Sequence, residues 1–493
     1  MNHVGKRGLS LILALLAGCS LQPVYEQPAA PVAPAYPGGP AYKDVSGTTT
    51  PAADIGWRDF LKDPRLQELV QMALGNNRDL RIAALDVARF QAQYRIQRAN
   101  LFPQVQAEAG SVASRGVASA AGRNVTTHLY SADIAASWTL DFFGRLSSLS
   151  DEALQQYFAT AQAGKATQIL LVAQVADQYL AMLAADELLA VTEHTLEAAQ
   201  SSYDLALVQL QAGTGTELSV AQARSVVEQA QANRAAQLRN RAQAENALVL
   251  LIGGPLPADL PRGLAFNSQN MLADIPADLP SDLLARRPDI MEAEANLRAS
   301  YAGIGAARAA FFPTISLTGA FGRESAQLDR LFKPQSKAWS FVPSITVPIF
   351  EGGALQASLD VAKIEKDAAV ARYEKAIQSA FREVADGLAA RGTFDDQIAA
   401  LERYVAAQQT ALELSELRFR TGVDSYLNVL TAQTNLYASE QTLVAARLAR
   451  LTTLVDLYES LGGGWLERTG DAPRAAADLS PDVRSTSARG GSE

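Results

Sequence analysis

The sequence predicts an α+β membrane protein that crosses its bilayer with β-strands and continues into very long helices. Three observations predict this class: two copies of one plan lie about 210 residues apart, four stretches alternate apolar and polar residues, and two long stretches contain no proline. The 493-residue chain has a charged fraction of 19% and a mean hydropathy of −0.01, between the values of soluble and membrane proteins. Composition alone therefore excludes neither class.

Charge and the rare residue types exclude several function classes. The formal net charge of −9 argues against nucleic acid as a partner, because both would be negative. The single cysteine, Cys19, excludes an intrachain disulfide framework, and three scattered histidines give no metal-ligand spacing. No Ser/His/Asp trio, phosphate-binding loop or pair of carboxylates stands in a site-like context. We therefore expect no enzyme, no cofactor and no metal centre.

The first eighteen residues are expected to be a lipoprotein signal peptide. Lys6 and Arg7 form a basic region, and the apolar run after them, about nine residues, is too short to span a bilayer. The run ends in Leu-Ala-Gly followed by Cys19, which resembles the bacterial lipobox, in which this cysteine is acylated and becomes the mature N-terminus. Ser20 stands where an inner-membrane retention signal would have Asp, which favours the outer membrane. An ordinary signal peptide with an incidental cysteine is the alternative.

The two copies are anchored by four pairs of similar segments with a nearly constant offset. Residues 78–103 recur as 288–313, 140–144 as 348–352, 212–218 as 421–427, and 252–254 as 461–463. Solenoid repeats have periods of 20 to 50 residues, so two such large copies predict a tandem duplication within one protomer.

The duplication predicts the organisation of the chain. We expect a signal peptide (1–18), an N-terminal extended arm (19–63), a first repeat (64–254), an equatorial linker (255–287), a second repeat (288–464) and a disordered C-terminal tail (465–493). Each repeat would consist of a helix, a β-hairpin (about 103–143 and 313–350), a long helix, a turn (about 212–217 and 421–426) and a further helix.

Proline-free stretches predict the long helices. Helix-forming residues fill about 146 to 211 and 354 to 420, and the first of these would be about 100 Å long at 1.5 Å per residue. Helices of this length must lie against others in a coiled coil or tube. After the second turn, a heptad seam is expected at spacings of 3 and 4. Its members are Leu427, Leu430, Thr434, Tyr437, Gln441, Val444, Leu448, Leu451 and Val455.

The alternating stretches predict two hairpins, with loops near 114–129 and 322–337. Apolar positions extend to Phe142 in the first hairpin and to Ile349 in the second. Strands of about 11 residues, tilted about 45°, rise about 25 Å, the height of the apolar band of an outer-membrane barrel. Aromatic residues near the strand ends fit interfacial girdles; they are Trp138, Phe142, Phe143, Phe311, Phe312, Trp339, Phe341 and Phe350. A soluble antiparallel sheet is the alternative.

No later helix is expected to cross the membrane, because the most apolar stretch, 169–191, contains three acidic residues. A membrane-spanning sheet must close on itself, and four strands cannot close. Two chains would give eight strands, and three would give twelve with room for a pore. The strands therefore predict an oligomer without deciding between these numbers.

Four stretches resemble the TolC-like outer-membrane factors, specifically their OprM/NodT-type lipoprotein branch. They are residues 19–25, 280–290, 419–427 and 461–465, and the resemblance covers about 19–467. It implies a homotrimer with a twelve-stranded outer-membrane β-barrel that continues into a twelve-helix periplasmic α-barrel. It also implies outer-membrane lipid, a periplasmic membrane-fusion adaptor protein and an inner-membrane resistance-nodulation-division pump as partners. The implied function is that of a passive exit duct of a tripartite efflux system for drugs or other small molecules, with a role in antibiotic resistance.

The resemblance also assigns site residues. Two turns would be the tips that contact the adaptor: Gly213, Thr214, Gly215 and Thr216 in the first, and Gly422, Val423, Asp424 and Ser425 in the second. A plain helix–helix turn is the structural alternative. Relatives close the periplasmic entrance just after the second turn, often with Leu plus Asp. The matching positions here are Leu427, Asn428 and Thr431, so the apolar constriction is kept and an acidic, cation-binding ring is in doubt.

Two other functions stay open on the sequence alone. Related ducts also secrete proteins, although the lipobox branch favours efflux. A periplasmic coiled-coil scaffold would use the long helices without spanning strands. The cargo is not encoded in this chain, because a water-filled duct takes its selectivity from the pump.

Overall fold

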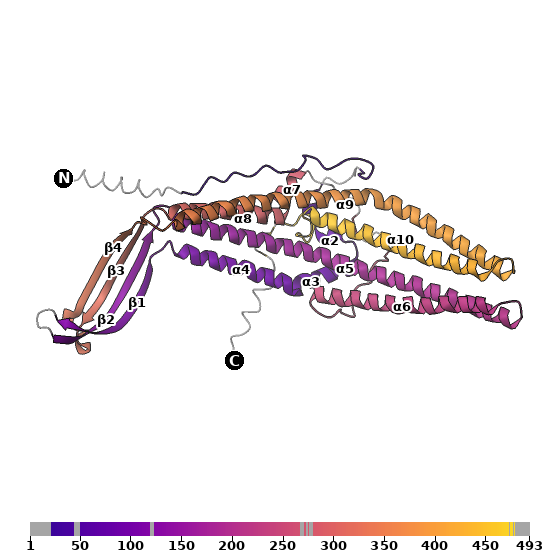
Figure 1. Ribbon diagram of the computed structural model, residues 1–493, viewed down its shortest axis with the longest axis horizontal. Helices are drawn as coiled ribbons and strands as arrows, with labels where there is room; N and C mark the ends of the chain where they lie inside the picture. The colour runs from indigo at the N-terminus through magenta and orange to yellow at the C-terminus, as the bar shows by residue number, and fades with distance from the viewer. Residues whose placement is uncertain are drawn as a thin grey trace. The chain divides into compact units, whose positions relative to one another are not determined.

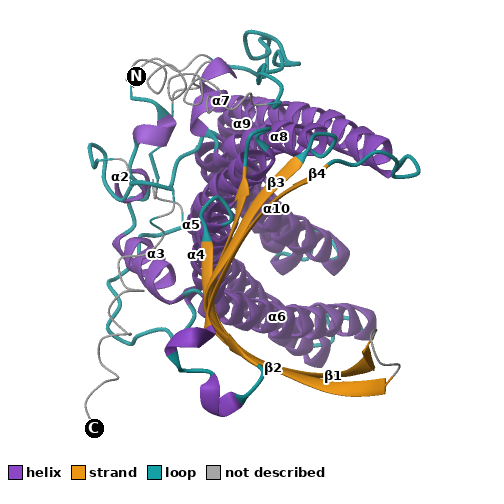
Figure 2. Cartoon of the chain, turned by 90° about the vertical axis from the view of Figure 1, so that its left-hand side faces the viewer, coloured by secondary structure: helices purple, strands orange, loops and turns teal. Residues whose placement is uncertain are grey.

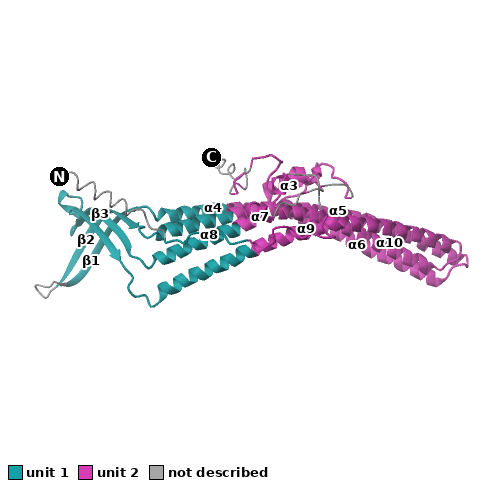
Figure 3. Cartoon of the chain, turned by 90° about the horizontal axis from the view of Figure 1, so that it is seen from above, with its two compact units in different colours: residues 1–29, 86–160, 292–374 teal, residues 30–85, 161–291, 375–493 magenta. Residues whose placement is uncertain are grey.

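The structure, a computed structural model, describes residues 21–43, 50–118, 123–266, 271–272, 275, 280–472, 474–476 and 478 (Figure 1). The chain divides into two compact units, coloured separately in Figure 3. Unit 1 consists of residues 1–29, 86–160 and 292–374, and unit 2 of residues 30–85, 161–291 and 375–493. Each unit is therefore assembled from three separate segments of the chain.

Unit 1 contains a four-stranded antiparallel sheet with strands in chain order, drawn as one curved sheet in Figure 2. The strands are β1 (Gln104–Ala118), β2 (Arg123–Leu140), β3 (Thr314–Ser325) and β4 (Lys337–Thr346). Each strand pairs with its neighbours in the chain, which leaves β1 and β4 as the edges.

The register places apolar residues in rows on one face of the sheet. Ile134 pairs with Phe321, which pairs with Trp339. Further rows on this face are Ala136–Gly319–Phe341, Trp138–Leu317–Pro343 and Leu140–Ile315–Ile345. Rows on the other face are mostly polar or small: Asp133–Gly322–Ala338, Ser137–Thr318–Val342 and Thr139–Ser316–Ser344. The two faces therefore differ in polarity, as alternation along each strand predicts.

The hairpin loops and strand ends differ from the sequence expectation. Pairing continues through Ser114 with Thr127 to Ala118 with Arg123, so the expected loop at 114–129 is largely strand. The threonine-rich stretch after Arg123 favours strands although it lacks clean alternation. The second loop begins later than expected, because β3 continues to Ser325.

The carboxyl ends of the hairpins are shorter than expected. β4 ends at Thr346, because Pro348 has no N–H to donate to a ladder. β2 ends at Leu140, because the next residue turns the chain into a helix. The Asp141 carboxylate accepts from the backbone N–H groups of Leu146 and Ser147 at 2.8 and 2.7 Å, and so caps that helix.

Four helices have residues in both units: α4 (Arg78–Ala99), α5 (Arg145–Gln211), α8 (Pro288–Ala309) and α9 (Ala354–Arg420). α5 and α9 are 67 residues each and begin and end within one residue of the expected bounds. Within the described residues, α5 is a helix long and apolar enough by composition to cross a membrane, in contrast to our sequence expectation. However, 67% of its apolar window is buried inside the chain, as in the core helix of a soluble region.

Unit 2 adds the helices α6 (Glu217–Ile252) and α10 (Tyr426–Ser460) and several short elements. The latter are η1 (Ala52–Asp54), α2 (Trp57–Phe60), α3 (Pro64–Asn76) and α7 (Pro280–Arg286). Asp63, fully buried, caps α3 and also accepts from the Tyr179 hydroxyl and the Leu264 N–H, both at 2.9 Å. These bonds tie α3 to α5 and to the linker.

The start of the C-terminal tail is packed, not disordered as expected. Trp465 and Leu466 are buried, and the Trp57 N–H donates to the Leu466 carbonyl at 2.9 Å. The ring of Phe60 stacks on Tyr458 with centroids 4.0 Å apart. The Ala- and Ser-rich composition of the later tail led to the expectation of disorder. The first residues of the tail are instead held by backbone hydrogen bonds to residues of α2.

Candidate functional site

The first expected tip joins α5 to α6 through a left-handed glycine. Gly213 has φ +75°, and the N–H groups of Thr214 and Gly215 both donate to the Gln209 carbonyl at 2.9 Å. This is the Schellman arrangement that ends helices at glycine. Thr216 then begins α6 as its N-cap, accepting from the Ser219 N–H at 3.2 Å.

The second expected tip, between α9 and α10, repeats this backbone. Gly422 has φ +75°, and the Val423 and Asp424 N–H groups donate to the Arg418 carbonyl at 2.9 and 3.3 Å. The Arg418 Nε also donates to the Asp424 Oδ2 at 2.5 Å, and this pairing holds the pKa of the Asp424 carboxyl below its usual range. Ser425 is the N-cap residue of α10 but makes no side-chain capping bond. The second turn thus carries an ion pair across its base.

The three expected gate positions are exposed on the first turns of α10. Leu427 is 52% exposed, and Asn428 and Thr431 are also exposed. The Thr431 Oγ1 donates to the Leu427 carbonyl at 2.8 Å, so the hydroxyl hydrogen is used within the helix. All three positions are thus open to solvent in the single chain.

The expected heptad seam is one residue out of place in the half of α10 near the turn. Tyr426, Val429, Gln433 and Leu436 are buried there, each one position before the residue expected. The tip core, as we call the apolar cluster to which most of them belong, consists of Ala206, Ala223, Leu412, Tyr426, Val429, Ala432 and Leu436. From Val444 onward, Val444, Leu451 and Val455 are buried as expected, whereas Leu448, also expected, is only half-buried.

This shift has a physical reason. α10 carries apolar residues on two adjacent faces, and the aromatic Tyr426 offers more area to bury than Leu427. Tyr426 contacts Phe419 edge-on with ring centroids 5.3 Å apart, and burial raises its pKa to about 12. The Gln433 amide donates to the Ser202 Oγ at 3.0 Å. The sequence signal that was missed is the tyrosine at the first position of α10.

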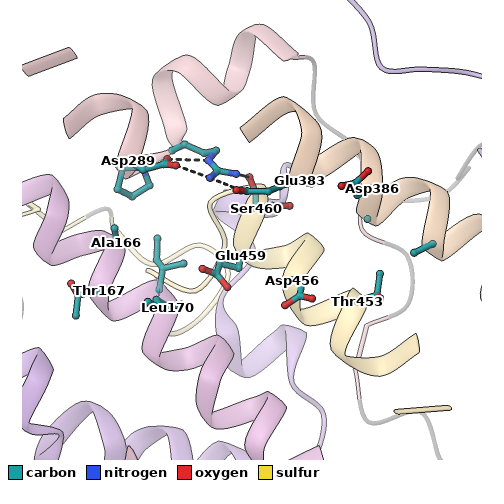
Figure 4. Close-up of a pocket in the computed structure, with 15 residues that line it drawn as sticks. Ala166, Thr167, Leu170, Asp289, Glu383, Asp386, Thr453, Asp456, Glu459 and Ser460 are labelled. Carbon is teal, nitrogen blue, oxygen red and sulfur yellow. Dashed lines mark hydrogen bonds and ion pairs between the residues drawn. The ribbon is translucent and has the colours of Figure 1, made fainter. Parts of the chain in front are cut away.

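Sequence reasoning also missed an acidic cavity of about 650 Å³ in unit 2 (Figure 4). α5, α8, α9 and α10 line it, and its acidic lining residues are Asp289, Glu383, Asp386, Asp456 and Glu459. Burial, together with Asp456 and Glu459, raises the pKa of Asp177 to about 7. Burial and Asp456 raise the pKa of Glu459 to about 7 as well, although Arg287 opposes this. The sequence does not reveal this cavity, because its acidic lining residues come from three separate helices and form no local motif.

Arg287 balances part of this acidic lining. Its guanidinium binds both Asp289 carboxylate oxygens, at 3.0 and 2.7 Å, and donates to the Ser460 carbonyl at 2.9 Å and to the Glu383 Oε2 at 2.8 Å. The dashed lines in Figure 4 mark interactions of this group. The second arginine of the Arg-Arg-Pro-Asp stretch therefore has three partners, Asp289, Ser460 and Glu383, joined through four hydrogen bonds.

The expected lipid-attachment residue, Cys19, lies outside the described residues. The structure therefore leaves it as an expectation from the lipobox pattern.

The model of the "outer membrane efflux protein" family matches residues 69–254 and 279–463. The toluene efflux pump outer membrane protein TtgC of Pseudomonas putida is 47% identical over 476 residues, covering 96% of this chain and 98% of the relative. The outer membrane protein OprJ of Pseudomonas aeruginosa is 44% identical, covering 93% and 96%.

Two solved structures are similar over most of the chain. The open state of the Neisseria gonorrhoeae MtrE outer membrane channel superposes with a TM-score of 0.82 at 40% identity, covering 92% of this chain and all of that one. A structure of CusC, described in terms of folding and transmembrane channel formation, gives a TM-score of 0.80 at 41% identity, covering 90% of this chain and all of that one.

Proposed function

The chain belongs to the outer membrane efflux protein family, and from this premise we propose that it is the passive outer-membrane exit duct of a tripartite efflux system. The family consists of efflux channel components and not of enzymes. The observation that carries the proposal is likeness over nearly the whole chain to outer-membrane channels in both sequence and fold. The protein is accordingly located in the outer membrane, with a large helical periplasmic portion.

The two-faced sheet supports a closed barrel built from several chains. Ile134, Phe321 and Trp339 form one apolar row and are 58, 66 and 77% exposed in the single chain. An apolar face of this kind suits lipid, and the polar face suits a water-filled lumen. The edge strands β1 and β4 need partners, because unpaired backbone groups are costly in a bilayer. Three chains supply twelve strands and leave room for a pore.

The same trimer would bring the long helices together. Four helices per chain, α5, α6, α9 and α10, give a twelve-helix periplasmic α-barrel. The family model matches two separate stretches, which supports a tandem duplication. The two repeats would be residues 64–254 and 288–464, joined by the linker 255–287. In this arrangement the turns at Gly213 and Gly422 are the periplasmic tips.

We assign the tips to an adaptor and the first residues of α10 to the gate. Gly213–Thr216 and Gly422–Ser425 would contact a periplasmic membrane-fusion adaptor, which links the duct to a resistance-nodulation-division pump. Leu427 would form the constriction, with Asn428 and Thr431 beside it. Their exposure in one chain supports this assignment, because a ring at the trimer axis must lie outside the core of each protomer. Cys19 would carry the lipid anchor.

The cargo is inferred from the relatives. TtgC is described as a toluene efflux pump protein, and a further P. putida relative, ArpC, as an antibiotic efflux pump protein. We propose antibiotics or other small apolar molecules as cargo here. Secretion of proteins is the alternative, but neither TtgC nor ArpC is described as a secretion duct.

The test is a deletion of the gene with complementation. The deletion should increase susceptibility to antibiotics and solvents, and the parent chain should restore resistance. The purified protein should be a trimer by light scattering, migrate differently on gels with and without heating, and conduct ions in planar bilayers. A soluble monomer would support a scaffold instead, and loss of a secreted protein with unchanged drug susceptibility would support secretion.

A further inference from the structure

The apolar face of the sheet in unit 1 ends in a row of cations. Phe321 pairs with Trp339 across β3 and β4, and one row further along the same two strands Arg323 pairs with Lys337. Because side chains alternate along a strand, Arg323 and Lys337 point to the same face as Phe321 and Trp339. Successive rows on one face are about 7 Å apart. The face that we assign to lipid therefore changes from aromatic to basic side chains within a single row.

This row lies at the end of the sheet that is remote from the helices. β3 begins shortly after α8 ends at Ala309, and α9 begins shortly after β4 ends. The other ends of these strands are joined by a loop that contains the short helices η2 (Leu328–Arg330) and η3 (Pro334–Ser336). Since the large helical portion is periplasmic, this loop is on the extracellular side of a sheet that spans the bilayer. The cations then stand at the outer surface of the membrane.

Charges of opposite sign are separated between the two faces at this end of the sheet. Glu324 follows Arg323 in the sequence and therefore points to the opposite face. On that face Glu108 pairs with Asp133, and in the next row Glu324 pairs with Ser131. Acidic side chains thus stand on the face assigned to the lumen, and basic side chains stand on the face assigned to lipid. A strand end that is merely solvated does not need this separation.

Arg323 and Lys337 repel each other unless an anion lies between them. Directly opposed residues of an antiparallel pair have Cβ atoms about 4.5 to 5.5 Å apart, and like charges in such positions are destabilising. Within the described residues neither side chain forms an ion pair, whereas in the adjoining loop Lys333 pairs with Asp329 at 4.0 Å. A bound anion would remove the repulsion, so the pair of cations itself points to a ligand.

The loop holds the Arg323 guanidinium in place. Its Nη1 donates to the Lys333 carbonyl at 2.7 Å and to the Oγ of Ser336, a buried side chain, at 3.4 Å. Both bonds use one nitrogen, and a guanidinium has further N–H donors on Nε and Nη2, in a planar arrangement that suits a phosphate. Lys337 is exposed and adds a point charge on a flexible stem. A fixed and an adaptable cation are therefore side by side.

We propose that Arg323 and Lys337 form a binding site for the phosphate groups of an outer-leaflet lipid, with one site on each protomer. The inference rests on the proposed function, because it requires the apolar face of the sheet to meet lipid. Aromatic side chains occupy the membrane interface, and long basic side chains one row further out reach the phosphates. Arg323 and Lys337 thereby distinguish a phosphorylated lipid from a neutral one.

The first experiment measures lipid binding to the purified oligomer in a neutral detergent by native mass spectrometry. The probes are lipid A with its phosphates and lipid A from which the phosphates have been removed. We expect the parent to bind the phosphorylated form more tightly. Lys337→Gln should weaken this binding about fivefold, the effect of one cation near an anionic lipid surface, and Arg323→Gln/Lys337→Gln should weaken it further. Lys337→Arg should preserve it, and equal binding of both probes to the parent would overturn the site.

Arg115→Gln is the matched control for the loss of one positive charge. The row of Arg323 continues through Ala132 to Ala109 of β1, and Arg115 is exposed on the same face of β1. It stands about 20 Å further along the strand, at 3.4 Å per residue, and is too far out for the lipid phosphates. Its loss should leave binding unchanged. Equal losses in Arg115→Gln and Lys337→Gln would indicate unspecific attraction and would overturn the site.

A competition experiment separates a lipid phosphate from a free one. Inorganic phosphate in excess should not displace phosphorylated lipid A, because the apolar face of the sheet also holds the acyl chains. Displacement would assign the two cations to a soluble anion and would overturn the lipid assignment.

Insertion into planar bilayers separates the site from the function on which it rests. If neither form of lipid A binds and the parent chain does not insert, the proposed function fails together with the site. If the parent chain inserts and conducts while Lys337→Gln binds phosphorylated lipid A as the parent does, the duct stands and only the phosphate site fails.

Discussion

The Arg287 Nη2 donates to the Glu383 Oε2 at 2.8 Å, which joins the start of α8 to α9. The same guanidinium reaches the last residue of α10 through the Ser460 carbonyl. Three helices from separate parts of the sequence therefore meet at one side chain that is only 10% exposed. Because the surrounding cavity is acidic, this arginine supplies both hydrogen bonds and charge balance.

Replacing Arg287 with Gln should lower the free energy of unfolding by about 2 kcal/mol, since it leaves Asp289 and Glu383 without their cation. The apparent midpoint of thermal unfolding measures this. Arg286→Gln is the matched control, because Arg286 pairs with Asp54 at the surface and its loss should cost less than about 1 kcal/mol. Equal effects of both substitutions would contradict a special role for Arg287.

Stability should fall as pH rises, through Asp177 and Glu459. Both have folded-state pKa values of about 7, above the ordinary carboxyl range, so the folded chain holds their protons more tightly than the unfolded chain. The stability that these protons contribute is present at low pH and is lost as pH rises from about 4 to about 7. Asp177→Asn should raise the thermal midpoint most at pH 8, less at pH 5, and hardly at all near pH 4.

The control for this pH effect is Asp204→Asn, which removes an exposed carboxylate from the same helix. It should leave the difference between the midpoints at pH 5 and pH 8 unchanged. A pH profile of Asp177→Asn that is parallel to the parent profile would show that Asp177 does not hold a proton in the folded state.

Leu427→Ala should raise single-channel conductance in planar bilayers severalfold, because it removes three apolar side chains from the proposed constriction of a trimer. Val423→Ala is the matched control, since Val423 is exposed on the turn four residues earlier. It should leave conductance unchanged and weaken adaptor binding. Unchanged conductance of Leu427→Ala would remove Leu427 from the gate.

Thr431→Asp should make the duct sensitive to multivalent cations. Thr431 is exposed and its hydroxyl donates within its own helix, so three carboxylates would face the axis of a trimer without breaking a contact between helices. Like charges held this close bind a multivalent cation strongly. Conductance should be blocked by a trivalent cation in this variant and not in the parent. Thr442→Asp, an exposed threonine farther along α10, should not confer the block.

Local sequence patterns predicted the elements of this fold better than their contacts. Glycine at Gly213 and Gly422 signals a helix end because few other residues adopt positive φ, and both turns are found there. The sequence placed the buried face of α10 one residue too far along the chain in the half near the turn. Tyr426 and Leu427 are both apolar, and only their packing partners decide which of them is buried. Periodicity shows which residues share a face of a helix, but it does not show which other helix packs against that face.

In the candidate site, too, local contacts could be predicted from the sequence and contacts between distant residues could not. The partners of Arg287 are 2, 96 and 173 residues away, so a local motif indicates only the first of them. Likewise, the contact of Tyr25 with Glu294 spans 269 residues and depends on how the arm runs along α8. Such pairs arise from tertiary packing, which one sequence does not reveal.

The sheet gives a direct comparison between its two faces. Ile134 stands in the apolar row with Phe321 and Trp339, whereas Ser137 stands on the opposite face beside Thr318. If the apolar face meets lipid, Ile134→Lys places a charge in the hydrocarbon at a cost of about 2 to 4 kcal/mol per chain. The amount of heat-modifiable oligomer in the outer membrane should therefore fall sharply.

Ser137→Lys is the matched control, because it adds the same charge to the same strand on the face assigned to the water-filled lumen. Lysine there stays solvated, so assembly should be close to that of the parent, while conductance should become less favourable to cations. The opposite result, with Ser137→Lys blocking assembly and Ile134→Lys tolerated, would invert the two faces. Equal tolerance of both would mean that neither face meets lipid, and the strands would then belong to a soluble sheet.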